Sequence, residues 1–238
     1  MSPRCSLVAF GVLCAWLGSC RTAVVVVETG VIVETPPGST GLSVDVYDAA
    51  TGVRLMQAKS TNDLIELPAG EYRITQFGSE ALVLAPSVVV TAGTVTRVRL
   101  GAILVTTVGG AEGLTYDLYD AAGTTRLDQV NDAGTIRPVP AGTYVLTEYF
   151  NEGLVYASGV VVEAGEVTDV LLGALRYTGA EDPFDIYDAT GETLIARPNT
   201  PNEIRSLPAG TYVLKPYFGD TIVASDVVVV AGEITILP

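Results

Sequence analysis

The 238-residue chain contains no histidine, and its three cysteines, Cys5, Cys14 and Cys20, all lie within the first twenty residues. Without imidazole there is no Ser-His or Cys-His nucleophile pair and no histidine-ligated metal site. Without later cysteines there is no disulfide framework and no cysteine zinc site. We therefore expect no enzyme, no cofactor and no transition-metal centre.

Positive charge is also scarce, with 13 Lys and Arg against 27 Asp and Glu and a formal net charge of -14. A chain this acidic repels phosphate backbones, so nucleic acid is not an expected partner. The acidic balance is equally explained by the solubility that a secreted protein needs.

The amino terminus has the pattern of a secretory leader. One basic residue, Arg4, precedes the 13-residue uncharged run 5–17, which is too short to span a bilayer but suits a signal peptide. Leu17-Gly18-Ser19-Cys20 then resembles the lipobox of bacterial lipoproteins. The resemblance implies cleavage after residue 19, a diacyl (palmitate-type) thioether on Cys20 and acylation of the new amino terminus. The alternative is an ordinary signal peptide with an incidental cysteine.

Lipidation would place the protein on the non-cytoplasmic side of the bacterial cell envelope, at the outer membrane or in the periplasm. Two acyl chains suffice for stable membrane anchoring. The membrane is thus one expected partner.

Three landmarks recur in constant order beyond residue 30, which indicates internal repeats. The tyrosines of "VYDA", "LYDA" and "IYDA" lie 72 and 68 residues apart, and each is followed 21 residues later by the proline of a "PAG" motif. A "VVV…AG" segment follows each proline. The repeats are therefore about 70 residues long.

Each repeat consists of short runs of Val, Tyr and Thr with a period of two, bounded by Gly and Pro, and no helical spacing is found. This pattern predicts an all-β protein of three tandem small antiparallel Greek-key β-sandwich repeats, Ig-like or prealbumin-like. We place the leader at 1–19 and the repeats at 20–101, 102–173 and 174–238. The joining segments lack Pro and Ser-rich stretches, so we expect a semi-rigid rod.

The "PAG-x-Tyr" motif predicts a tyrosine corner, in which the tyrosine hydroxyl bonds back to nearby backbone. The three corner tyrosines are Tyr72, Tyr144 and Tyr212. We interpret them as folding devices rather than binding residues.

The repeats resemble bacterial surface modules of the transthyretin-like, carboxypeptidase-regulatory-like and PEGA kinds, a resemblance that implies a fold and says little about function. They are also similar to collagen-binding B-type repeats, whose strand glutamate assists an isopeptide bond. Only Glu148 occupies that position; the other repeats have Gln76 and Pro216. Because neither lysine, Lys59 or Lys215, lies on a first strand, we expect no isopeptide bond.

Two sets of residues are candidate binding sites. Repeated aspartate pairs are weak candidates for calcium, which takes oxygen ligands, although turn capping and solvated faces explain them equally; they are Asp45, Asp48, Asp117, Asp120, Asp185 and Asp188. Aromatic pairs that follow one strand could contact a partner protein or sugar, or could pack between repeats; they are Tyr149, Phe150, Tyr217 and Phe218.

We therefore expect a lipid-anchored structural or interaction protein of the cell envelope, which presents β-sandwich modules to an envelope protein or glycan. The alternative is a calcium- or carbohydrate-binding accessory module of an adhesin or transport system.

Overall fold

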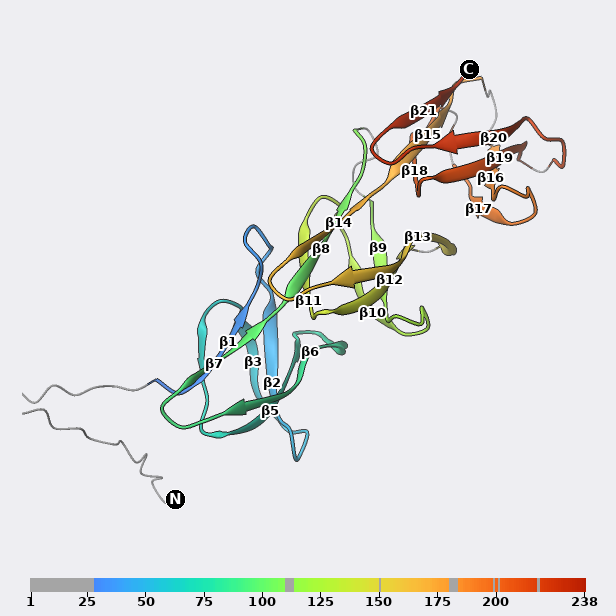
Figure 1. Ribbon diagram of the computed structural model, residues 1–238. Helices are drawn as coiled ribbons and strands as arrows, with labels where there is room; N and C mark the ends of the chain where they lie inside the picture. Colours follow the sequence, from blue (N-terminus) through green and yellow to red (C-terminus); the bar gives the residue numbers. More distant parts are fainter. Residues whose placement is uncertain are drawn as a thin grey trace, which may run out of the picture.

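The computed structural model describes residues 28–109, 114–149, 151–179, 184–198, 200, 202–217 and 219–238. Within these residues the protein is all-β and contains no helix. Three units follow one another in a row from the amino-terminal to the carboxy-terminal end (Figure 1). The predicted all-β fold of tandem sandwich repeats is confirmed. Cys20 lies outside the described residues.

Every unit has seven strands. Those of unit 1 are β1 (Gly30–Glu34), β2 (Ser43–Asp48), β3 (Arg54–Ser60), β4 (Leu64–Glu66), β5 (Gly70–Gln76), β6 (Ser79–Val90) and β7 (Val95–Arg99). Those of unit 2 are β8 (Gly101–Thr106), β9 (Tyr116–Tyr119), β10 (Arg126–Val130), β11 (Ile136–Val139), β12 (Gly142–Glu148), β13 (Asn151–Val162) and β14 (Val167–Leu171). Those of unit 3 are β15 (Gly173–Tyr177), β16 (Phe184–Tyr187), β17 (Leu194–Ala196), β18 (Arg205–Leu207), β19 (Gly210–Pro216), β20 (Ala224–Val229) and β21 (Ile234–Leu237).

The strands of each unit form a three-stranded and a four-stranded sheet. In unit 1 the orders are β4-β1-β7 and β3-β2-β5-β6, and units 2 and 3 repeat both orders. All pairings are antiparallel except that of the first and last strands, which run parallel in every unit. The chain consequently leaves a unit at the end opposite to its entrance, which arranges the units in a row.

The links between units are short and ordered by hydrogen bonds. Only Leu100 separates β7 from β8, and only Leu172 separates β14 from β15. Both leucines are buried, and their carbonyls accept the amide hydrogens of Gly165 and Gly232 at 2.8 and 3.0 Å. Each link is therefore bonded to the turn before the last strand of the unit that follows it.

Alternating side chains fill the sandwiches, as the period of two predicts. One cluster of buried apolar side chains lies in unit 1, and a second runs without interruption through units 2 and 3. Leu127 of β10 packs against both clusters. The cores of the three units thus join across the junctions.

The three tyrosine corners are present. The hydroxyls of Tyr72, Tyr144 and Tyr212 donate to the carbonyls of Pro68, Pro140 and Pro208 at 2.8, 2.7 and 2.8 Å. The glycine of the motif lies beneath the ring, since a Cβ at Gly70 would be 3.0 Å from the Tyr72 hydroxyl oxygen. Burial raises the pKa of Tyr144 and of Tyr212 to about 12.

We predict that Tyr144→Phe lowers the free energy of unfolding by about 1 kcal/mol, because one hydrogen bond of a buried hydroxyl is lost. Equilibrium urea unfolding measures the change. Thr143→Ala, at the exposed neighbouring position, is the control and should leave stability nearly unchanged. Equal stability of Tyr144→Phe and the unmodified chain would contradict the structural role of the corner.

Candidate functional site: the junctions between units

The six aspartates of the predicted acidic pairs all have protein partners. The first members, Asp45, Asp117 and Asp185, are buried. They pair with Arg54, Arg126 and Arg197 at 3.3, 3.5 and 2.6 Å, respectively.

The second members cap the turns that follow their strands. Asp48 Oδ1, for example, accepts the Thr51 amide and hydroxyl hydrogens, both at 2.8 Å. The Thr51 hydroxyl bond lowers the pKa of Asp48, and the Thr190 hydroxyl bond lowers the pKa of Asp188 to about 2. In the described part of the chain no cluster of three or more metal-ligating side chains occurs.

The aromatic pairs are described only in part, because Phe150 and Phe218 lie outside the described residues. Tyr149 is half-buried, and its amide donates to the Thr115 carbonyl at 3.3 Å. Tyr217 is 36% exposed, and the Arg197 guanidinium lies 4.4 Å from the centre of its ring. The structure therefore brings one predicted ring, Tyr217, into a cation–π contact inside unit 3.

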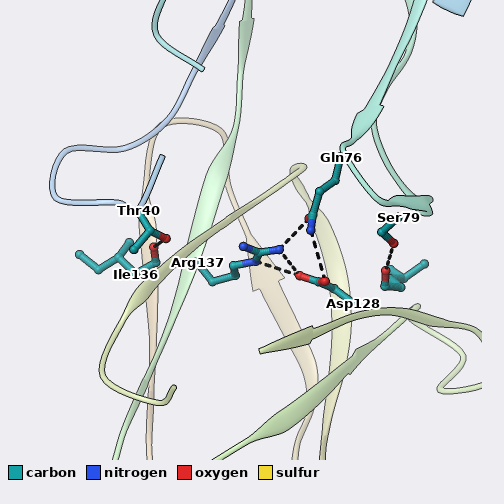
Figure 2. A network of polar contacts seen from close by, with 7 residues as sticks. Thr40, Gln76, Ser79, Asp128, Ile136 and Arg137 are labelled. Carbon is teal, nitrogen blue, oxygen red and sulfur yellow. Dashed lines mark hydrogen bonds and ion pairs between the residues drawn. The ribbon is translucent and has the colours of Figure 1, made fainter. Parts of the chain in front are cut away.

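A cluster that the sequence analysis did not identify lies at the junction of units 1 and 2 (Figure 2). Arg137 of β11 donates from Nε to Asp128 Oδ2 of β10 at 2.8 Å and from Nη2 to Gln76 Oε1 at 2.7 Å. Gln76 ends β5 of unit 1, and its amide nitrogen lies 3.5 Å from Asp128 Oδ1. We call these three residues the first clasp.

Two further side-chain hydrogen bonds cross the same junction, and the Thr40 amide also donates to the Ile136 carbonyl at 3.2 Å. The Ser79 hydroxyl of unit 1 donates to the Leu127 carbonyl at 3.0 Å, and the Thr40 hydroxyl donates to the Ile136 carbonyl at 3.3 Å (Figure 2). Units 1 and 2 are thus joined through two separate segments of unit 1.

The junction of units 2 and 3 repeats the arrangement with different chemistry. Arg205 of β18 donates from Nη2 to both carboxylate oxygens of Glu148, which ends β12. The Tyr156 hydroxyl donates to Glu148 Oε1 at 3.2 Å, and burial raises the Tyr156 pKa well above its usual range. We call these three residues the second clasp.

Both clasps are largely shielded from water. The side chains of Arg137 and Arg205 are only 17% and 18% exposed. A charge in such a position must be paired, because leaving one partner of a buried ion pair alone is strongly destabilising. Each junction meets this condition with one carboxylate, from the same unit in the first clasp and from the preceding unit in the second.

The clasp residues occupy equivalent positions. Arg137 and Arg205 each precede the proline of the "PAG" motif by three residues, and Gln76 and Glu148 each end the strand that opens with that motif. At the two outer positions, unit 1 has Ile65 and unit 3 has Pro216. The sequence signal was present as "IR" before two of the three "PAG" motifs.

The part of the chain that the structure describes contains no helix long and apolar enough to cross a membrane. No protein-family model and no curated protein matches the sequence. A solved structure, the Bacillus anthracis TIE protein, is 16% identical over 88% of this chain and 50% of its own, with a TM-score of 0.21. A likeness this weak carries no argument, so the fold assignment depends on strand topology alone.

We predict that Arg205→Met lowers the free energy of unfolding by about 3 kcal/mol, because Glu148 then loses the Arg205 guanidinium in a shielded position. Urea unfolding measures the loss. Arg97→Met, which breaks the exposed pair with Glu34, is the matched control and should leave the free energy of unfolding nearly unchanged.

The double variant Glu148→Gln/Arg205→Met should recover most of that loss, because no unpaired charge remains. If Arg205→Met and Arg97→Met lowered the free energy of unfolding by similar amounts, the second clasp would contribute no more to stability than an exposed ion pair.

Proposed function

We propose that the protein is a lipid-anchored spacer of the bacterial cell envelope, which holds three β-sandwich units at fixed relative positions and presents them to an envelope protein or glycan. The observation that supports this proposal most directly is the pair of clasps. A chain that only needed binding modules could join them by flexible segments, which are rich in Gly, Ser or Pro.

The junctions restrict movement between units in two ways. Each link is a single buried leucine whose carbonyl is bonded to the next unit. Each clasp fixes a second point away from the link, formed by the end of β5 or β12 on one side and by β11 or β18 on the other. Two separated points of attachment resist both bending and twisting.

The shared cores add to this restriction. Apolar contacts across a domain interface determine whether domains move independently. The cluster that runs through units 2 and 3, and the contact of Leu127 with both clusters, make the interfaces part of the hydrophobic core.

The proposed anchor is Cys20, on the basis of the lipobox-like residues before it. Gly30, the first residue of β1, lies ten positions after Cys20. Even fully extended, ten residues reach only about 35 Å. A lipid on Cys20 would therefore keep unit 1 close to the membrane surface.

We expect a narrow distribution of distances between units 1 and 3. Pulsed electron paramagnetic resonance measures this distance between spin labels at Val89→Cys and Val228→Cys, two exposed positions. The labelled chain starts at Arg21, so it contains no other cysteine. Arg137→Met/Arg205→Met should broaden the distribution, because one side of each junction is released. Arg97→Met should leave it unchanged. A broad distribution in the unmodified protein would refute the spacer.

The anchor is tested separately in cells. Cys20→Ser should move the protein from the membrane fraction to the soluble fraction or leave an uncleaved leader, and mass spectrometry of the unmodified protein should find acyl chains on residue 20. A mature, unacylated chain in the soluble fraction would support the ordinary signal peptide instead. This result would leave the spacer geometry untouched.

A further inference from the structure

The two internal junctions bury one equivalent apolar side chain from each later unit. Leu127 of β10 packs against the core of unit 1, and Ile195 of β17 packs against the core that units 2 and 3 share. Leu127 comes directly before the residue that pairs with Leu118 of β9. Ile195 likewise comes directly before the residue that pairs with Ile186 of β16. In unit 1 that position is Leu55, whose neighbour Met56 pairs with Val46.

Leu55 is 49% exposed, unlike its two counterparts. Unit 1 is the first of the described units, so none of them covers this face. We call Leu55 and the adjoining Met56 and Leu64 the receiving face of unit 1, because the same positions in unit 2 contact unit 1; these are Leu127, Asp128 and Ile136.

The preceding unit also contributes one side chain to each internal junction, and this side chain is buried there but exposed in unit 3. Leu84 of β6 and Tyr156 of β13 each precede the alanine that pairs with Ile74 or Leu146, and both are buried. In unit 3 the equivalent residue is Val223, which precedes Ala224 and is 42% exposed.

Ile222 beside Val223 is also exposed. We call Ile222 and Val223 the distal end of unit 3. At the internal junction of units 2 and 3, Val155, which corresponds to Ile222, lines one hollow of about 210 Å³ together with Ile195.

The clasp positions that lie outside the two internal junctions carry no charged side chain. Where the internal junctions place an arginine opposite Gln76 or Glu148, unit 1 has Ile65, which is buried in its own core, and unit 3 has Pro216. Met56 likewise takes the place of Asp128. If these two faces met, the clasp positions would need no ion pair, because Ile65 is already buried within unit 1 and Pro216 carries no charge.

We propose that the distal end of unit 3 in one copy of this chain docks on the receiving face of unit 1 in a second copy. The contact repeats, between molecules, an interface that the chain makes twice within itself. Such an interface is heterologous, so it joins copies head to tail into open chains or rings. It involves only described units and does not depend on the proposed lipid anchor or spacer role.

The test uses the chain from Arg21 to Pro238, which contains every strand and both core clusters. In analytical ultracentrifugation, the mean mass should rise with concentration beyond that of a dimer by about 1 mM, the effective concentration that tethering typically provides. Leu55→Asp and Val223→Asp should each abolish association. Val89→Asp and Val161→Asp, at exposed positions on the four-stranded sheets, are the matched controls and should retain it.

A mixture of the two inactive variants is the sharpest test. Leu55→Asp copies keep a functional distal end and Val223→Asp copies keep a functional receiving face, so the mixture should form dimers and nothing larger. The proposal is overturned if the unmodified chain stays monomeric throughout, as it would if a different protein or the segment before residue 28 covers Leu55. It is equally overturned if either aspartate variant associates like the unmodified chain.

Discussion

The arrangement of the three units depends on one constraint: an arginine placed in a shielded junction must meet a carboxylate there. Arg137 and Arg205 come from equivalent positions, and both of their carboxylates belong to unit 2. Asp128 lies in the same unit as Arg137, whereas Glu148 lies in the unit before that of Arg205. In the first clasp the neighbouring unit needs to supply only a neutral amide, Gln76. The second clasp cannot form its ion pair until the two units are docked, which couples their folding most directly.

The remaining architecture follows from the parallel pairing of first and last strands. Because each unit is entered at one end and left at the other, a one-residue link suffices and each unit touches only its neighbours. Stability in such arrays is a sum of unit and nearest-neighbour terms. A sandwich of about 70 residues buries a small core, so the joined apolar clusters are a substantial part of that sum. The glycines at 101 and 173 serve the same link, because a Cβ there would lie 2.3 Å from the Glu163 or Val230 carbonyl oxygen.

Equivalent positions differ among the units according to whether they have a neighbour. The two internal junctions carry polar and charged pairs, whereas the outer faces expose the apolar side chains of Leu55 and Val223. The proposed spacer and the proposed end-to-end contact use equivalent surfaces of different units. The spacer uses those that meet inside one chain, and the end-to-end contact uses those that would meet between two chains. Together they would give a row of sandwiches whose interfaces share one geometry. The interfaces inside a chain would carry polar and charged pairs, and those between chains would be apolar.

The all-β class, the three repeats and the tyrosine corners could be predicted from the residues alone, because the period of two and the "PAG-x-Tyr" spacing are local and recur three times. It also indicated stiff links, from the lack of flexible residues between repeats. The clasps could not be predicted in this way, because Gln76 and Arg137 are 61 residues apart and Glu148 and Arg205 are 57 apart. Their pairing requires the docking of two separately folded sandwiches, and no period or short motif specifies which strand ends that docking brings together.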